Sequence, residues 1–244
     1  MDTEIDSTDT STGRQDTYHF SITPTNVPKI DTKYRKIVTS IPPENSIPIL
    51  NELRKYEPES MSLELPVVWD RAEDFQVFDE NGNCWIDFCA GTFVTNTGHR
   101  NPKICNAISE IVNNNFLHNY YFPSKIRAKL VKKLHDMTAV NLEKVFLLTT
   151  GAETIECCIK LARIYGRKIN PKKIGIVSFV GAMHGKTLGA LMVGGKTKEK
   201  HWITNHDPDM HHLPFPKESS DDEVFHNHMK QLEQSGVDLS TIAA

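Results

Sequence analysis

The sequence predicts an α/β protein with a parallel-rich sheet flanked by helices, together with a small α+β segment at its amino-terminal end. Residues 144–148 and 174–179 are apolar runs with the length of strands that are buried on both faces. Between them an apolar stripe recurs at helical spacing, formed by Ile155, Cys158, Ile159 and Ala162. Because parallel neighbours require a long connection, this order of strand, helix and strand predicts a βαβ crossover.

The turn between the first strand and the helix reads Thr-Thr-Gly-Ala-Glu, residues 149–153. Thr149 and Thr150 are candidate N-cap hydroxyls, and the charge of Glu153 suits the first turn of a helix. Gly151 allows the backbone to approach another backbone or a ligand closely. The free N–H groups of such a turn bind anions, so these residues favour a phosphate site. An ordinary capped helix is the alternative that the turn by itself leaves open.

The amino-terminal part of the chain is predicted to contain a tail and a small folded segment. Residues 1–28 are rich in Ser, Thr and Asp, a composition that cannot form a core, so we expect a disordered tail. Residues 29–95 are expected to form the amino-terminal segment of a small domain. An amphipathic helix is predicted by the spacing of Ile47, Leu50, Leu53 and Tyr56. Residues 75–88 predict a β-hairpin, because Asn81-Gly82 marks a turn between two apolar runs.

Residues 96–244 are expected to form the first part of a larger domain. One helix is predicted from Pro102, and a second is capped by Ser124. The loop at residues 181–187 reads Gly-Ala-Met-His-Gly-Lys-Thr and leaves the carboxyl end of the second buried strand, where α/β sheets place ligands. Further elements are expected after this loop: a short helix at 188–193, a helix at 221–235 and the start of a strand near the end of the chain.

Composition and charge exclude several classes of function. The chain has 244 residues, of which 39% are hydrophobic and 24% charged, and its formal net charge is −3. Lysine and arginine are spread along the chain, which argues against a nucleic-acid partner or an anionic membrane surface. No apolar run approaches the roughly 20 residues that a membrane helix needs. We therefore expect a cytoplasmic protein with neither a nucleic-acid nor a membrane partner.

Cysteine, histidine and glycine patterns exclude three common kinds of site. The five cysteines include no C-x-x-C pair, which indicates reduced thiols rather than a disulfide framework or a zinc cluster. The histidines of residues 201–212 lack the spacing of a helical zinc site. Gly185 and Gly195 each precede Lys-Thr, but neither has the earlier glycine of a nucleotide-binding P-loop.

Four segments, taken together, resemble the class III, or omega, aminotransferases, which use pyridoxal 5'-phosphate (PLP). They occur in the family's order, at residues 77–108, 144–163, 181–191 and 211–216. The resemblance implies a type I PLP-dependent transferase fold, present in part, and a homodimer with active sites at the subunit interface. It also implies transfer of an amino group from an omega-amino acid or amine to a 2-oxo acid. The members most similar in character are the 4-aminobutyrate aminotransferase-like enzymes.

The resemblance also assigns residues to the site. Gly151 and Ala152 match the positions whose N–H groups hold the cofactor phosphate, and Met183 stands where the family usually has an aromatic ring stacked on the cofactor. Sulfur against a ring is favourable but offers less flat area. The full cofactor-binding set carried over is Thr150, Gly151, Ala152, Met183, His184 and Gly185. The substrate-binding set is Thr92, Tyr121 and Phe122.

Two catalytic groups of the family have no counterpart in these 244 residues. Transamination needs a lysine that holds the cofactor as a Schiff base and a carboxylate against the pyridine nitrogen. The resemblance places both downstream of Ala244, so we expect the amino-terminal half of an aminotransferase, inactive alone. One alternative is a non-catalytic truncated or split-gene product that binds a complementing partner. Another is a phosphate-binding or structural α/β domain without amine chemistry.

Overall fold

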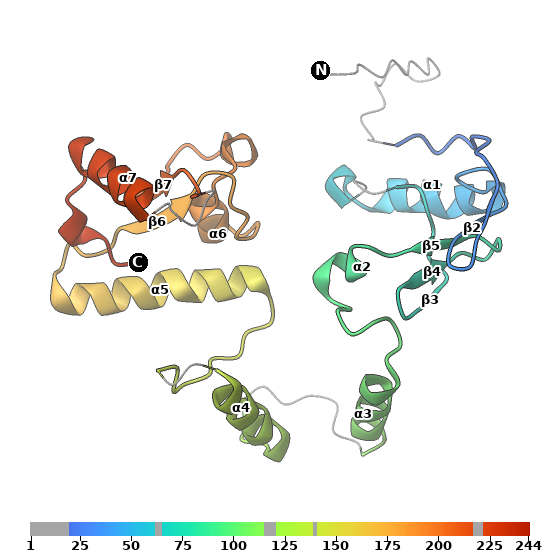
Figure 1. The fold of residues 1–244 in the computed structure, drawn as a ribbon, viewed down its shortest axis with the longest axis horizontal. Helices are drawn as coiled ribbons and strands as arrows, with labels where there is room; N and C mark the ends of the chain where they lie inside the picture. The colour runs from blue at the N-terminus through green and yellow to red at the C-terminus, as the bar shows by residue number, and fades with distance from the viewer. Residues whose placement is uncertain (1–19, 62–64, 115–120, 139–140, 217–221) are drawn as a thin grey trace. The chain divides into compact units, whose positions relative to one another are not determined.

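The computed structural model describes residues 20–61, 65–114, 121–138, 141–216 and 222–244. They belong to two compact units, Met1–Phe122 and Pro123–Ala244, and each unit has its own sheet (Figure 1). Most of the predicted tail, residues 1–19, lies outside the described residues. Within its remainder, Thr25 forms an antiparallel bridge with Ile41. The predicted division at residue 96 falls inside the first unit, and the three-part domain organisation stays a prediction.

The sheet of the first unit is antiparallel, in the order β1-β2-β5-β4-β3. Its strands are β1 (Ile30–Asp31), β2 (Lys36–Ile37), β3 (Arg71–Glu73), β4 (Gln76–Phe78) and β5 (Cys84–Ile86). The predicted hairpin is confirmed, because β4 pairs with β5 in a register that sets Val77 opposite Trp85. Gly82 in the connecting turn has a φ of +83°, a conformation that glycine adopts without steric cost.

A buried asparagine fixes the β4–β5 turn against the strand β2. Asn83 is 0% exposed. Its side-chain oxygen accepts hydrogen bonds from the N–H groups of Val38 and Thr39, and its amide nitrogen donates to Thr39 Oγ1 and to Asp79 Oδ2, each at 2.7 Å. Every polar atom of this side chain is therefore paired, as burial requires.

The described part of the first unit also contains helical elements, of which two were predicted. The elements are η1 (Glu44–Ser46), α1 (Ile47–Tyr56), η2 (Glu59–Met61), α2 (Ala90–Phe93) and α3 (Pro102–Asn113). The predicted helices at 47–56 and from Pro102 are confirmed as α1 and α3. Asn101 caps α3, since its side chain accepts a hydrogen bond from the N–H of Lys103. No residue of α3 is buried, and its apolar side chains are about half-exposed.

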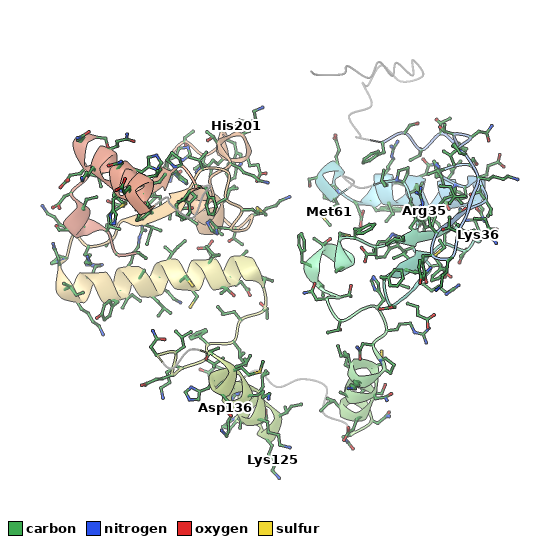
Figure 2. All side chains as sticks on the ribbon, in the orientation of Figure 1. Arg35, Lys36, Met61, Lys125, Asp136 and His201 are labelled. Carbon is green, nitrogen blue, oxygen red and sulfur yellow. The ribbon has the colours of Figure 1, made fainter. Side chains whose placement is uncertain are left out.

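The second unit contains the longer helices. They are α4 (Lys125–Met137), α5 (Gly151–Ile169), α6 (Leu188–Val193), η3 (Thr197–Lys200), α7 (Asp222–Gln234) and η4 (Leu239–Thr241). Ser124 caps α4 as predicted, by accepting from the N–H of Arg127. Figure 2 draws the side chains of α4, with Lys125 at its start and Asp136 near its end labelled. None of its residues is buried.

The sheet of the second unit is parallel. Strand β6 (Ile176–Phe179) pairs in parallel with β7 (Met210–Leu213), and Gly175 forms a parallel bridge with Ile242. The predicted strand near the end of the chain is thus present as this bridge, supported by the bond from Val177 N–H to the Ala244 carbonyl. Figure 1 shows α5 running alongside β6, and its apolar stripe faces β6 across a cavity of about 220 Å³.

The predicted strand at residues 144–148 was wrong. No ladder hydrogen bond joins this run to another strand within the described ranges, and Phe146 is 69% exposed. The βαβ crossover into 174–179 is therefore absent, and the parallel neighbours of β6 are instead β7 and Ile242. An apolar run becomes a strand only where a neighbour satisfies its N–H and C=O groups.

Candidate functional site

The first turn of α5 is closed by a capping box. The hydroxyl of Thr150 accepts a hydrogen bond from the N–H of Glu153 at 3.1 Å. The carboxylate of Glu153 accepts in return from the N–H groups of Thr149 and Thr150 and from the Thr149 hydroxyl. The bond from that hydroxyl is the main cause that lowers the pKa of Glu153. Thr150 is thus the predicted N-cap, and Glu153 occupies two of the amides of the turn.

Two amides of the turn remain available. Within the part of the chain that the structure describes, the N–H groups of Gly151 and Ala152 have no protein acceptor. Gly151 also borders open space, because a Cβ atom added there would meet no atom within 4 Å. Two adjacent free N–H groups at the amino end of a 19-residue helix are able to bind an anion.

The loop after β6 lies directly on this turn. A Cβ atom at Gly185 would stand 2.6 Å from Cβ and 2.9 Å from Cα of Ala152. Gly185 has a φ of +132°, which favours glycine as well. The structure therefore brings together two sequence motifs, the start of α5 and the 181–187 loop, through Ala152 and Gly185, which are 33 residues apart in the sequence.

His184 and Met183 precede Gly185 in this loop. The ring of His184 is held by Ser178 of β6, with Nε2 at 3.1 Å from the serine Oγ. Ser178 is buried, so this bond anchors the histidine to the sheet. Met183 is 53% exposed, as is expected of a side chain that faces a ligand or solvent. Ser178 was not predicted from the sequence, because a serine inside a strand carries no local signal of its partner.

Glu156 is a second residue that the sequence analysis missed. Its Oε1 atom accepts a hydrogen bond of 2.6 Å from the Thr187 hydroxyl and one of 3.0 Å from the Ala190 N–H. Those two groups belong to the N-cap and first turn of α6. Glu156 therefore satisfies the amino end of α6 from a neighbouring helix.

In the first unit, Thr92 lies within four consecutive left-handed residues. The φ angles of Ala90, Gly91, Thr92 and Phe93 are 50°, 58°, 65° and 67°. Each non-glycine residue in this conformation costs of the order of 1 kcal/mol, so the surrounding contacts must hold the turn.

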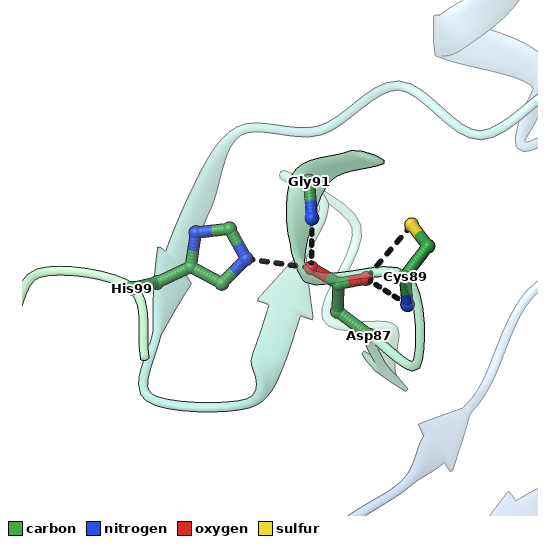
Figure 3. Close-up of polar contacts among 4 residues, drawn as sticks. All are labelled: Asp87, Cys89, Gly91 and His99. Carbon is green, nitrogen blue, oxygen red and sulfur yellow. Dashed lines mark hydrogen bonds and ion pairs between the residues drawn. The ribbon is translucent and has the colours of Figure 1, made fainter. Parts of the chain in front are cut away.

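Asp87 supplies those contacts (Figure 3). Its carboxylate accepts from the N–H and Sγ of Cys89, from the N–H of Gly91 and from the ring of His99. Burial alone would raise the pKa of Asp87, but the hydrogen bonds from Cys89, His99 and Gly91 lower it to about 2. The carboxylate is therefore ionised at neutral pH and holds the turn by charge-assisted bonds.

The nine predicted site residues fall in different units. Thr150, Gly151, Ala152, Met183, His184 and Gly185 belong to the second unit, where contacts join the two motifs. Thr92, Tyr121 and Phe122 belong to the first unit, and the last two are 84% and 76% exposed. The substrate role of these three residues stays a prediction. Among the described residues no cluster of His, Cys, Asp and Glu could hold a metal ion, and no helix is long and apolar enough to cross a bilayer.

Solved structures share the fold of this chain. A transaminase from the marine bacterium Virgibacillus has a TM-score of 0.71 and 19% identity, with 81% of this chain and 46% of that chain covered. An (S)-enantioselective omega-transaminase from Thermomicrobium roseum has a TM-score of 0.65 and 26% identity, with coverages of 80% and 44%. Taurine:2-oxoglutarate aminotransferase from Bifidobacterium kashiwanohense, solved with PLP and glutamate, has a TM-score of 0.66 and 22% identity, with coverages of 80% and 46%. The fold is thus the type I PLP-dependent transferase fold, present in part.

The sequence identifies the family. The model of class III aminotransferases matches residues 58–244, and the chain belongs to this family. Acetylornithine aminotransferase from Agrobacterium fabrum is 36% identical over 134 residues, which are 54% of this chain and 33% of that protein. Putrescine aminotransferase from Pectobacterium atrosepticum is 29% identical over 177 residues, or 72% and 36%. The chain therefore spans about a third of the length of these curated relatives.

Proposed function

We propose that this chain serves PLP-dependent transamination and that it grips the cofactor by its phosphate through the N–H groups of Gly151 and Ala152. The observation that carries the proposal is the pair of unpaired amides at the start of α5, with open space beside Gly151. The amides lie inside the region that matches the family, residues 58–244. The positive end of the helix dipole favours a doubly charged phosphate at this position.

The neighbouring residues fit the same cofactor. The Thr150 hydroxyl already accepts from Glu153 N–H, so its proton is free for a phosphate oxygen. Met183, His184 and Gly185 are the residues of the loop that would face the rest of the cofactor. When bound, PLP supplies an electron sink for the carbon that carries the amine. The role of this chain is to bind and orient the cofactor, and Ser178 keeps His184 in place.

The names of relatives support a proposal for the substrates. We propose an amino donor whose amine is distant from an α-carbon and a 2-oxo acid acceptor. Relatives named for acetylornithine, putrescine and succinylornithine support the donor class, and the taurine:2-oxoglutarate enzyme supports the acceptor. 4-Aminobutyrate is a further candidate donor. Thr92, Tyr121 and Phe122 are proposed to contact the substrate, in a cytoplasmic homodimer.

Phosphate recognition is tested by removing one N–H without disturbing the helix. Gly151 is the first residue of α5, a position that accepts proline, and Thr150 has φ −135° and ψ 160°, which suit a residue before proline. We expect Gly151→Pro to weaken PLP binding at least about tenfold, since a hydrogen bond to a charged group is worth about 1.5–3 kcal/mol. Gly151→Ala keeps the N–H and is the matched control.

Equilibrium dialysis of PLP, pyridoxal and inorganic phosphate measures the effect. The proline variant should lose affinity for PLP and for inorganic phosphate, while binding of pyridoxal stays the same. Equal PLP affinity in the proline and alanine variants would refute phosphate recognition by this amide. The donor class is tested on the protein isolated from its source, by following glutamate formed from 2-oxoglutarate with 4-aminobutyrate, putrescine or acetylornithine. Absence of glutamate with all three donors would refute the proposed donors.

A further inference from the structure

We infer that Glu156 is a positioning residue that holds the 181–187 loop in the correct place beside the N–H groups of Gly151 and Ala152, which are proposed to bind the phosphate. The inference rests on the proposed function, because it concerns the same cofactor site. Glu156 does not reach the free amides itself. It acts through Thr187 and Ala190, which donate hydrogen bonds to its carboxylate.

The spacing along α5 is the first argument. Ala152 and Glu156 are four residues apart, so they lie on one face of the helix. Ala152 meets Gly185, and Glu156 binds Thr187 and Ala190. One face of α5 therefore contacts both the 181–187 loop and α6. A shift of α6 would move Gly185 away from the first turn of α5.

The glycine at position 189 is the second argument. A Cβ atom there would overlap Oε2 of Glu156 and stand 3.0 Å from its Cδ atom. Only glycine lets the carboxylate come this close to the backbone of α6. Both helices thus allow this close approach. Helix α5 provides the acceptor Glu156, and α6 has no side chain at Gly189.

The short length of α6 is the third argument. A helix of six residues has little stability of its own, so its position depends on contacts at its ends. Glu156 satisfies the amino end. At the other end the buried ammonium group of Lys200 donates to the carbonyls of Met192 and Gly194, at 2.9 and 2.7 Å. The start of the loop is held separately, by the bond from the Gly195 N–H to the Ala182 carbonyl and by the bond between Ser178 and His184, so Glu156 supports its other end.

Four variants of the chain test this inference. Glu156→Ala removes both hydrogen bonds, whereas Glu156→Gln keeps them, since both use the single atom Oε1. Gly189→Ala should displace the carboxylate and act like Glu156→Ala. The double variant, with Glu156→Ala and Gly189→Ala together, completes a double-mutant cycle. In this variant the methyl group added at position 189 has no carboxylate to displace. Dissociation constants for PLP and inorganic phosphate are measured by equilibrium dialysis, and the free energy of unfolding by urea denaturation.

Glu156→Ala should raise the dissociation constant for PLP about tenfold, as expected for a misplaced loop, and leave that for inorganic phosphate unchanged. Glu156→Gln should stay within about threefold of the wild type. Gly189→Ala should raise the dissociation constant for PLP about tenfold in the wild-type background, but less than about twofold in the Glu156→Ala background.

Three outcomes would overturn the inference or its basis, and they are separable. If the wild type binds neither PLP nor phosphate, the proposed function fails. If the wild type binds both and Gly151→Pro loses both, but Glu156→Ala keeps its affinity for PLP, only the positioning role of Glu156 fails. If Glu156→Ala weakens PLP and phosphate equally and in proportion to the loss of folded protein, Glu156 acts on stability alone and the inference is wrong.

Discussion

Oδ2 of Asp87 lies 2.8 Å from Nε2 of His99, and the two side chains are only 1% and 13% exposed. Because Asp87 is ionised at neutral pH, its oxygen can only accept, so Nε2 of His99 carries the proton. This bond closes the segment that contains Thr92. It explains how a turn of left-handed residues persists in the first unit.

The first prediction concerns the pH dependence of this pair. The pKa of Asp87 is about 2 in the folded chain against an ordinary 3.8, so ionisation stabilises the fold by about 2 kcal/mol. This stabilisation is complete above about pH 4 and is lost as the pH falls through about 2. Asp87→Asn should lower the free energy of unfolding by that amount at pH 7, and the difference should vanish near pH 2.

Urea denaturation followed by tryptophan fluorescence measures this difference. A Trp202→Phe background restricts the signal to Trp69 and Trp85 of the first unit. Asp31→Asn is the control, because Asp31 is exposed and 3.9 Å from its partner Lys36, and it should change stability by less than about 0.5 kcal/mol. A Asp87→Asn variant with the pH profile of the wild type would contradict the prediction.

The second prediction concerns Asn83. Asn83→Ala removes the acceptor of the Val38 N–H and the side-chain donor to Asp79 Oδ2 in a buried site, while Asp79 Oδ1 keeps its two backbone donors. We expect a loss of about 2–4 kcal/mol, as for removal of one member of a buried network. Asn81→Ala, in the same turn but without side-chain bonds among the described residues, should cost less than about 1 kcal/mol. Similar losses in both variants, by the same fluorescence assay, would show that the turn and not the network matters.

The third prediction compares two glycines of the second unit. A Cβ atom at Gly195 would overlap the carbonyl of Phe179 and the N–H of Gly181. Backbone atoms cannot yield, so Gly195→Ala should cost about 3 kcal/mol. Gly151→Ala meets no atom and should leave stability unchanged or raise it by up to about 1 kcal/mol. Circular dichroism during urea unfolding measures both, and a Gly195→Ala variant as stable as the wild type would contradict the packing described.

The fourth prediction concerns the ion pair between Arg163 of α5 and Asp207 before β7. Nη1 and Oδ2 are 2.8 Å apart, and the hydrogen bond from Arg163 is the main cause that lowers the pKa of Asp207. The pair is about one-quarter exposed, so we expect a coupling of about 1 kcal/mol in a cycle of Arg163→Met and Asp207→Asn. Its contribution should be present above pH 3.8, the ordinary pKa of an aspartate, and fall in acid. Additive effects of the two substitutions would refute the coupling.

Local signals account for the elements that the sequence predicted correctly. The hairpin around Asn81-Gly82, the Ser124 cap and the start of α5 all depend on residues within four positions of each other. The run at 144–148 was wrong because a strand depends on a partner that its own residues do not specify. Sequence reasoning could read its hydrophobicity but not its pairing.

The candidate site divides in the same way. The free amides of Gly151 and Ala152 follow from a helix start, and the sequence predicted them. Glu156 accepts a hydrogen bond from Thr187, which lies 31 residues away in the sequence. The residues around Glu156 do not predict that contact. The glycine at position 189 was a usable signal, because glycine in the short helix α6 lowers its stability and often indicates close packing.

The exposed apolar side chains of α3 and α4, among them Ile104, Ile108, Ile126 and Leu130, affect how stability is measured. Solvatochromic dyes that report unfolding by binding to apolar surface will already fluoresce with the native chain, so their melting curves will start at a high signal and be flat. Hydrophobic-interaction resins will retain the protein tightly for the same reason. Calorimetry and intrinsic chromophores are therefore the safer probes for every variant named above.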